Sequence, residues 1–466
     1  MKITNVLFTI FISSIALAGR AQSPYSHDRV YAANQVSNTV SVVDPSTNRF
    51  IGEINLGKPY PNVLSPLYKG QALVHGLRYS QEKKLLAVVS IGSNAVTLIS
   101  TENNKVLKTI YLGRSPHEPT FTPDSKQLWV SVRGEAYISV IDVASMIEIK
   151  RVPVADGPGM VSFSPDGKLA YICSSFTPEL DIVSTSTYKI VKKLAVISPF
   201  SPNIFTSPKG EWVAMTHKDV GKVTVINTTT QSIEKVLTTG PITNHVTFSY
   251  VKNRLKMLVT VGGSNMVKIF DVAQDFKQTD SIAVGALPHG LWPSADGKLL
   301  YVGLEYGDAV QYINTETMMV SSSEKIGQSP QALVYAPDAV SDEKNTVGLT
   351  KLDDTSSTII MVLKSVEKQK TAIGRLAFRP IGLTDLVEQI FTLLSPNTSY
   401  TLAFSKSKNA PYKVDYEINS FTTDATGKYN GQSTGIVKST DVNITTPDYH
   451  HVILIENGSK QVILIN

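Results

Sequence analysis

The chain of 466 residues repeats one short unit along most of its length. Four turns make the unit visible, and they read Thr122-Pro123-Asp124-Ser125, Ser164-Pro165-Asp166-Gly167, Ser207-Pro208-Lys209-Gly210 and Ser294-Ala295-Asp296-Gly297. Proline presets φ and glycine ends a turn without steric cost, so these sequences suit type I turns. Counting back five residues from each turn head, with degenerate turns at Ser80, Ser249 and Ala336 included, gives positions 75, 117, 159, 202, 244, 289 and 331. Successive positions are 42, 42, 43, 42, 45 and 42 residues apart.

Each unit has the pattern of four short strands. After the turn comes an apolar run such as residues 298–303, then a small polar loop and an alternating run such as residues 138–142. A turn rich in Thr and Asn and a last strand that ends at glycine complete the unit. Alternation with period two among β-branched residues indicates strands. Seven such units predict an all-β chain that forms a seven-bladed propeller.

The first and last units are incomplete in complementary ways. Residues 29–57 lack an inner strand before them, and residues 331–336 form an inner strand with no outer strands after it. We expect the late strand to complete the blade that the early residues begin. Such a closure removes exposed sheet edges and ties the two ends of the ring together.

Residues 31–44 read Tyr-Ala-Ala-Asn-Gln-Val-Ser-Asn-Thr-Val-Ser-Val-Val-Asp. This stretch resembles the YVTN family repeat, whose consensus runs Tyr-Val-Thr-Asn and then Ser-Asn-Thr-Val-Ser-Val-Ile-Asp. Residues 159–168 resemble the inner strand and turn of the same family. The resemblance covers residues 29–338 and implies the seven-bladed fold. It implies no single function, because similar repeats occur in surface-layer proteins, in lactonases and in the propeller domains of nitrous oxide reductase and cytochrome cd1 nitrite reductase.

The N-terminus predicts export. Lys2 precedes an apolar stretch over residues 6–18, with small residues around it, so residues 1–21 are expected to be a signal peptide and the mature protein periplasmic or at the cell surface. No other segment approaches the roughly 20 apolar residues that span a membrane. The net charge of +5 without a Lys/Arg cluster argues against nucleic-acid binding. We expect a monomer. Cys173 is the single cysteine, so the chain can form neither an intrachain disulfide nor a Cys-x-x-Cys-His haem site.

The propeller is expected to span residues 22–338 and to be followed by a polar linker, residues 339–348. Residues 349–466 then predict a β-sandwich. Its expected strands are residues 357–364, 376–381, 399–404, 414–421, 451–456 and 461–465, with one short amphipathic helix over 384–394. Residues 394–402 resemble the tyrosine-corner segment of fibronectin type III domains, which implies that Tyr400 hydrogen-bonds back to the backbone.

Two rings of residues should meet at one rim of the propeller channel, since the second strand of each blade returns to the face where the inner strand starts. The starts of the inner strands supply His75, His117, Gly159, Pro202, Asn244, His289 and Gln331. The ends of the second strands supply Gln35, Ile91, Arg133, Ser175, His217, Gly262 and Glu305. This rim is a concave, histidine-rich place where a ligand can bind.

Three functions compete for this rim. Neutral imidazoles suit zinc, copper or iron, which makes His75, His117 and His289 candidate ligands of one transition-metal ion, with Glu305 or His217 as a fourth. A lactonase-like hydrolase would use His117 or His289 as general base and Arg133 to hold an anionic substrate. The third function, which the sequence favours over an enzyme, is a secreted binding or scaffold protein of unknown ligand. Its candidate binding residues are His75, His117, His289, Arg133, His217, Asn244, Glu305 and Gln331.

Overall fold

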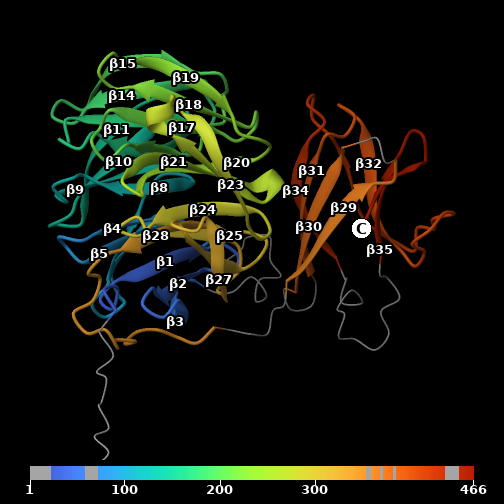
Figure 1. Ribbon diagram of the computed structural model, residues 1–466, viewed down its shortest axis with the longest axis horizontal. Coiled ribbons are helices and arrows are strands. Elements are labelled where there is room, and N and C mark those ends of the chain that lie inside the picture. The colour runs from blue at the N-terminus through green and yellow to red at the C-terminus, as the bar shows by residue number, and fades with distance from the viewer. Residues whose placement is uncertain (1–22, 58–71, 353–357, 368–370, 381–384, 436–450) are drawn as a thin grey trace, which may run out of the picture.

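The computed structural model describes residues 23–57, 72–352, 358–367, 371–380, 385–435 and 451–466, and the expected signal peptide lies outside these ranges. The described chain forms two all-β domains that lie side by side (Figure 1). The first is a seven-bladed propeller of four-stranded antiparallel sheets, as the repeat predicts. In the description below, the strands of each blade are given from the channel outward.

Blade 1 consists of β28 (Pro330–Ala336), β1 (Arg29–Asn34), β2 (Thr39–Asp44) and β3 (Arg49–Asn55). Blade 2 consists of β4 (Val74–Ser80), β5 (Leu85–Ser90), β6 (Ala95–Ser100) and β7 (Lys105–Tyr111). Blade 3 consists of β8 (Pro116–Phe121), β9 (Gln127–Val132), β10 (Tyr137–Asp142) and β11 (Ile147–Pro153). Blade 4 consists of β12 (Pro158–Phe163), β13 (Leu169–Ser174), β14 (Glu179–Ser184) and β15 (Lys189–Ala195).

Blade 5 consists of β16 (Ile204–Thr206), β17 (Trp212–His217), β18 (Lys222–Asn227) and β19 (Ser232–Thr238). Blade 6 consists of β20 (Thr243–Val251), β21 (Arg254–Val261), β22 (Met266–Asp271) and β23 (Lys277–Ala283), with the short 3₁₀ turns η2 (Gly262–Ser264) and η3 (Val272–Gln274) between strands. Blade 7 consists of β24 (Pro288–Pro293), β25 (Leu299–Leu304), β26 (Ala309–Asn314) and β27 (Met319–Lys325).

Blade 1 is closed as the incomplete repeats predict. β28 pairs antiparallel with β1, and Val334 lies opposite Tyr31 in the register. One blade is therefore assembled from the two ends of the propeller chain. This pairing leaves no open edge in the ring and links residues about 300 positions apart in sequence.

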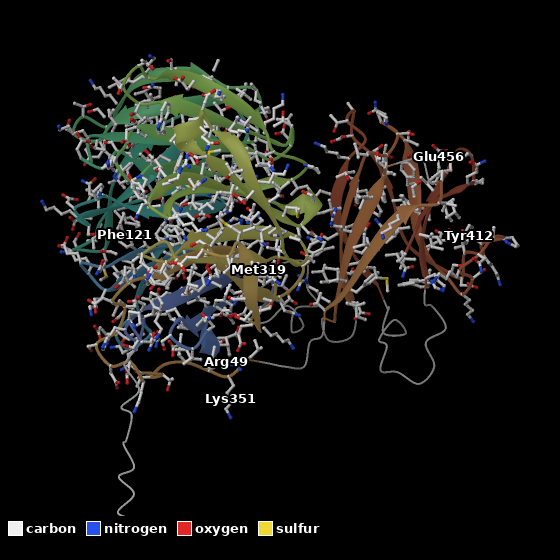
Figure 2. All side chains as sticks on the ribbon, viewed as in Figure 1. Arg49, Phe121, Met319, Lys351, Tyr412 and Glu456 are labelled. Atoms are coloured by element: carbon white, nitrogen blue, oxygen red, sulfur yellow. The ribbon has the colours of Figure 1, made fainter. Side chains whose placement is uncertain are left out.

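The hydrophobic core lies between the blades rather than in the channel. The inner three strands of a blade are buried on both faces, as in β5, where all six residues are buried. The outermost strands alternate or are exposed, and Met319 on β27 projects into solvent (Figure 2). Cys173 is fully buried in β13, as expected of a small apolar core residue, and burial raises the pKa of its thiol to about 12.

The turn aspartates stabilise the repeated turns. Thr122 donates to Asp124, Ser164 to Asp166, and Ser294 to Asp296, each at 2.7 Å. In each of these turns the same carboxylate also accepts a backbone N–H two residues further on. These carboxylates therefore shape the turns on the face opposite the histidines.

The second domain is one continuous eight-stranded sheet. Its strands are β29 (Ile359–Ser365), β30 (Ile373–Pro380), β31 (Asp385–Thr392), β32 (Ser399–Ser405), β33 (Tyr416–Thr422), β34 (Tyr429–Gly435), β35 (His451–Glu456) and β36 (Val462–Ile465). They follow the order β33-β32-β35-β36-β29-β30-β31-β34, and the two end strands approach each other, so the sheet is barrel-like around one core. The Ser395 N–H donates to the hydroxyl of Tyr400 at 3.1 Å, which confirms the expected tyrosine corner.

The helix expected over residues 384–394 is wrong, because this segment contains strand β31. Its apolar residues come in adjacent pairs, Leu386-Val387 and Ile390-Phe391, a spacing that also suits one face of a helix. In the structure both faces of the strand are buried. Val387 and Phe391 pack in the core of their own domain, whereas Leu386 and Ile390 pack against the propeller.

The C-terminal domain packs on the propeller face where the inner strands begin. In Figure 1, β30, β31 and β34 are its strands nearest to the propeller. Ala377 and Ile390 form a buried apolar cluster with Leu287 and Tyr306 of blade 7. Leu386 contacts Val36 of blade 1.

Polar contacts extend the same interface. Arg379 on β30 is fully buried, forms ion pairs with Asp308 of the propeller and with Glu388 of its own domain, and donates to the carbonyl of Glu305 at 2.7 Å. Lys428 donates to the carbonyl of Asp219 in blade 5. The domain therefore covers the mouth side of several blades.

The expected polar linker, residues 339–348, lies along the propeller. The hydroxyl of Thr101 donates to the carbonyl of Ala339, and the Asn104 amide donates to the carbonyl of Val347 at 2.9 Å. Thr350 then forms an isolated β-bridge with Glu53 on β3. Within the described ranges, no helix has the length and apolar character needed to cross a membrane.

Candidate functional site: the histidine-lined channel mouth

A β-bulge at the start of the inner strands shapes the channel mouth. In blade 3 the register shifts by one residue between Pro116 and Pro119, and blades 1, 2, 4, 6 and 7 carry the same irregularity. A bulge places an extra residue on one strand and redirects side chains. Two consecutive residues, such as His117 and Glu118, can therefore both reach the mouth.

Four imidazoles gather there. The ring of His75 lies 4.4 Å from that of His117 and 6.4 Å from that of His289, measured between centroids. The ring of His245 lies 4.8 Å from that of His289. All four residues are between 4% and 8% exposed. The structure thus brings together the three histidines that the sequence selected and adds His245.

Hydrogen bonds to the next blade fix two of these rings. Nδ1 of His117 lies 2.7 Å from the carbonyl oxygen of Gly159, and Nδ1 of His289 lies 2.6 Å from the carbonyl oxygen of Gln331. A carbonyl oxygen only accepts, so each Nδ1 carries the proton. In the neutral ring, Nε2 then presents an unprotonated lone pair, which is the arrangement of a metal-ligating histidine.

A buried carboxylate and a buried guanidinium lie beside the rings. Oε1 of Glu118 is 3.9 Å from Nδ1 of His75, and Oε2 is 3.6 Å from a guanidinium nitrogen of Arg78. Arg78 is held over the rings of Phe205 and Trp292, 5.1 and 4.8 Å from their centroids. This cation–π contact fixes the guanidinium inside the channel.

Burial favours the neutral form of every imidazole in the cluster. Burial, together with the charges of Arg133 and Lys218, lowers the pKa of His75 to about 3. Burial also lowers the pKa values of His117, His245 and His289 well below 6.5. Neutral rings are the form that binds metal ions.

Burial raises the pKa values of the carboxyl groups at the mouth, whereas it lowers those of the imidazoles. Burial raises the pKa of Glu118 to about 7, and the charge of Arg78 opposes the rise. Burial also raises the pKa of Glu305, against the charge of Lys218. Oε2 of Glu305 lies 4.0 Å from Nε2 of His289, so the predicted residue Glu305 does belong to the mouth. Among the residues that the structure describes, neither oxygen of Glu118 has a hydrogen-bond partner, nor does Oε2 of Glu305.

Arg133 and Lys218 supply positive charge at the mouth. Arg133 lies over the rings of Phe176 and Phe200, at 5.6 and 5.2 Å from their centroids. Its charge acts on His75 and His117, and that of Lys218 acts on His75, His245 and His289. Burial lowers the pKa of both cations.

Three predicted site residues have structural roles instead. Both ring nitrogens of His217 are engaged, with Ser201 at 2.8 Å and Thr224 at 2.6 Å, so this histidine lies outside the cluster. The Asn244 amide donates to the carbonyl of Pro288 at 2.7 Å and ties blade 6 to blade 7. The Gln331 side chain donates to the hydroxyl of Ser329 at 3.0 Å, while its backbone carbonyl orients His289.

The donor set at the mouth fits a transition-metal ion. Ligand atoms of His75, His117 and Glu118 all lie within 4.8 Å of one another. Ligands around a tetrahedral zinc ion are about 3.4 Å apart, so the ligand atoms would have to move somewhat closer together to hold one. Among the described residues, both oxygens of Glu118 are buried without a hydrogen-bond partner. Nδ1 of His75 forms no hydrogen bond of good geometry, although the backbone of His117 lies close enough to affect the pKa of this ring. An ion would satisfy these atoms, which otherwise cost free energy.

Sequence reasoning missed His245, Glu118, Arg78 and Lys218. The first two directly follow predicted rim positions, and a strict alternation of faces assigns such neighbours to the opposite side. Arg78 and Glu118 did carry a usable signal, since each is a charged residue within an inner strand that is otherwise largely apolar. Lys218 directly follows the predicted rim residue His217.

Comparisons with known proteins agree with this fold. Residues 69–213 match the family model of YNCE-like β-propellers. The chain is 25% identical over 303 residues to the seven-bladed β-propeller protein Rv1057 of Mycobacterium tuberculosis, which covers 61% of this chain and 74% of that protein. It is 28% identical over 147 residues to antigen Lp49 of Leptospira interrogans, which covers 31% of this chain and only 30% of that protein.

Two solved structures share the fold. Hydrazine synthase of Kuenenia stuttgartiensis aligns with a TM-score of 0.51 at 18% identity, covering 56% of this chain and 88% of that chain. A functionally unknown protein of Desulfotomaculum acetoxidans aligns with a TM-score of 0.57 at 11% identity, covering 66% and 99%. At these identities the likeness concerns the fold alone.

Proposed function

We propose that the protein is a binding protein that holds one divalent transition-metal ion, zinc, copper or iron, at the channel mouth through His75, His117 and Glu118. The observation that carries this proposal is the orientation of His117. Its Nδ1–H is held by the carbonyl of Gly159, which leaves the Nε2 lone pair free. The nearby Glu118 carboxylate is buried and accepts no hydrogen bond from a described residue, with Arg78 3.6 Å away. Two imidazoles and one carboxylate are a common donor set for these ions.

The surroundings support a resident ion. Arg78 lies against Glu118 and would hold the carboxylate in place, the role that outer hydrogen-bond partners play for metal ligands. His289, whose ring lies 6.4 Å from that of His75, and Glu305 beside it offer further donors. The C-terminal domain packs on the same face and limits access of solvent.

A hydrolase that uses His117 or His289 as a general base has less support. Such a base works best with a pKa near the working pH. Burial lowers the pKa values of both rings well below 6.5. Depressed values suit metal ligands, and for this reason we favour binding over general-base catalysis.

Elemental analysis of the full chain, purified without a polyhistidine tag, tests the proposal. We expect about one equivalent of zinc, copper or iron, either as purified or after incubation with the ion. Glu118→Gln preserves side-chain volume and removes the anionic ligand, so it should weaken metal binding at least tenfold. His27→Ala, a half-buried histidine before β1, is the matched control and should bind like the parent. A folded parent that binds none of the three ions would overturn the proposal.

We also propose that the protein is exported. The apolar stretch behind Lys2 supports this location. Fractionation of cells that express the full chain checks it, because an exported protein should be recovered from the periplasm or cell surface and be shortened by about 21 residues. Recovery of the uncleaved chain from the cytoplasm would contradict export.

A further inference from the structure

Three neighbouring blades present polar donors at equivalent positions of the mouth. Arg133, Ser175 and Lys218 follow the second strands of blades 3, 4 and 5. Arg133 and Lys218 therefore flank blade 4. Between them blade 4 contributes Gly159 at the start of its inner strand and Ser175 just after its second strand, followed by Phe176, over whose ring Arg133 lies.

Buried donor and hydroxyl atoms of this trio lack partners. Nε of Arg133 and Oγ of Ser175 are both shielded from solvent, and neither has a hydrogen bond in the described part of the chain. Arg133 is kept in place by the rings of Phe176, in a loop of blade 4, and Phe200, between blades 4 and 5. The backbone N–H of Lys218 donates to the carbonyl of Phe200 at 3.2 Å, so this segment is positioned as well.

Neither positive charge forms an ion pair with a described carboxylate, although the charge of Glu305 acts on Lys218 at longer range. Within the described ranges, neither Arg133 nor Lys218 has an acidic partner within 4.0 Å. Glu118 is instead placed against Arg78, and Glu305 against His289. Arg133 has no acidic partner within the described ranges, and the only carboxylate that acts on Lys218, Glu305, lies beyond ion-pair distance. Such partly buried cations favour a bound anion, since charges removed from water are normally paired.

We propose that Arg133, Ser175 and Lys218 form a binding site for a small oxyanion, a carboxylate or a phosphate. The guanidinium fork matches either group in a bidentate manner, the serine hydroxyl adds a hydrogen bond, and the ammonium adds charge. Blade 4, which lies between the two cations, also provides the Gly159 carbonyl that holds Nδ1 of His117, so the bound anion lies next to the imidazole cluster. Capture of the anion by the three donors does not depend on a metal ion. A role of the anion as co-ligand of an ion at His75 rests on the proposed metal-binding function.

Titration calorimetry at low ionic strength, with acetate and inorganic phosphate as separate probes, tests this site. In chelator-treated protein we expect one of the two anions to bind, and Arg133→Met or Lys218→Met should weaken that binding at least tenfold. Lys209→Gln, an exposed lysine of blade 5 on the opposite face, should leave it unchanged. Acetate binding alone would assign a carboxylate ligand, and phosphate binding alone a phosphate ligand.

The same titrations on metal-loaded protein distinguish the anion-site proposal from the metal-binding proposal. If the anion is a co-ligand, it should bind more tightly when the ion is present, and Ser175→Ala should weaken it in both states. Anion binding without any metal binding would uphold the anion site and overturn the metal proposal. Metal binding in a protein that takes up neither acetate nor phosphate, or that binds them equally after Arg133→Met, would overturn the anion site alone.

Discussion

Nδ1 of His117 lies 2.7 Å from the carbonyl oxygen of Gly159 on the neighbouring inner strand. This hydrogen bond gives Nδ1 a structural role and leaves Nε2 as the atom that can bind a metal ion. Asparagine places an amide N–H close to the position of Nδ1 but has no group at Nε2. His117→Asn should therefore keep the bond between the blades and change the free energy of unfolding by less than about 1 kcal/mol. It should nevertheless weaken metal binding roughly 100-fold.

His117→Ala is the comparison for this variant. It removes both functions and leaves the Gly159 carbonyl without its donor, so it should lose metal binding and also about 1–3 kcal/mol of stability. Urea unfolding and metal titration of the same samples measure the two effects. If His117→Asn binds metal as tightly as the parent, His117 is a structural residue and not a ligand.

The docking of the two domains depends on Arg379. This fully buried guanidinium pairs with Asp308 and Glu388 and donates to the Glu305 carbonyl. Arg379→Met would leave two carboxylates without their partner, and we expect a loss of about 3–5 kcal/mol. Differential scanning calorimetry should show a lower and less cooperative transition, as the domains begin to unfold separately.

An exposed ion pair provides the control for Arg379. Arg49 lies 3.5 Å from Glu324, with the Arg49 side chain 74% exposed. Arg49→Met should therefore cost at most about 1 kcal/mol. If Arg379→Met and Arg49→Met lower the free energy of unfolding equally, the buried ion pairs of Arg379 stabilise domain docking no more than an exposed ion pair does.

The propeller fold was predictable because the same four-strand pattern occurs in seven repeats. A period near 42 residues identifies the blade, and degenerate copies such as the turn at Ser249 are placed by their neighbours. The C-terminal domain has no repeat. Its strand β31 was mistaken for a helix because one of its faces is buried by the propeller, a contact that local sequence does not reveal.

The site was predictable only at the regular positions of the repeat. His75, His117 and His289 occupy the register position and were found. Glu118 and His245 each follow that position by one residue and reach the mouth because the strand bulges there. The sequence predicts His217 at the rim, but Lys218 holds that position, because its N–H bonds the Phe200 carbonyl as the N–H of Arg133 bonds that of Ser115. His217 lies one residue out of this register, and its ring points into blade 5 to bond Ser201 and Thr224.

The tyrosine corner should stabilise the C-terminal domain. The hydroxyl of buried Tyr400 accepts the N–H of Ser395, and Tyr400→Phe would leave this N–H unpaired. Because Ser395 is exposed and water can reach its N–H, we expect a loss of about 0.5–1.5 kcal/mol, measured by urea unfolding. Tyr412 projects from the edge of the same domain (Figure 2), so Tyr412→Phe should have no effect. If the two variants are equally stable, the hydrogen bond between Ser395 and Tyr400 makes no net contribution to the free energy of unfolding.

Asp271 gives a pH-dependent prediction within blade 6. Its carboxylate lies 2.9 Å from Lys256 and 2.7 Å from Arg254, and it accepts the N–H of Ala273 at 3.0 Å. Burial raises the pKa of Asp271, but the hydrogen bond and charge of Lys256 and the charge of Arg254 outweigh it, so the net pKa lies below 3.8. The folded state thus holds the ionised form more favourably than the unfolded chain does.

The sign of the effect follows from this lowered pKa. A group whose pKa is lower in the folded state contributes stability that is present above its unfolded pKa, about 3.9, and is lost as the pH falls through the folded value. Asp271→Asn should therefore cost about 1–2 kcal/mol at pH 7. The difference between parent and variant should stay constant down to about pH 5 and shrink below pH 4. Urea unfolding at pH 7, 5 and 3.5 measures it, and a difference that grows as the pH falls would contradict the stabilising ion pairs of Asp271.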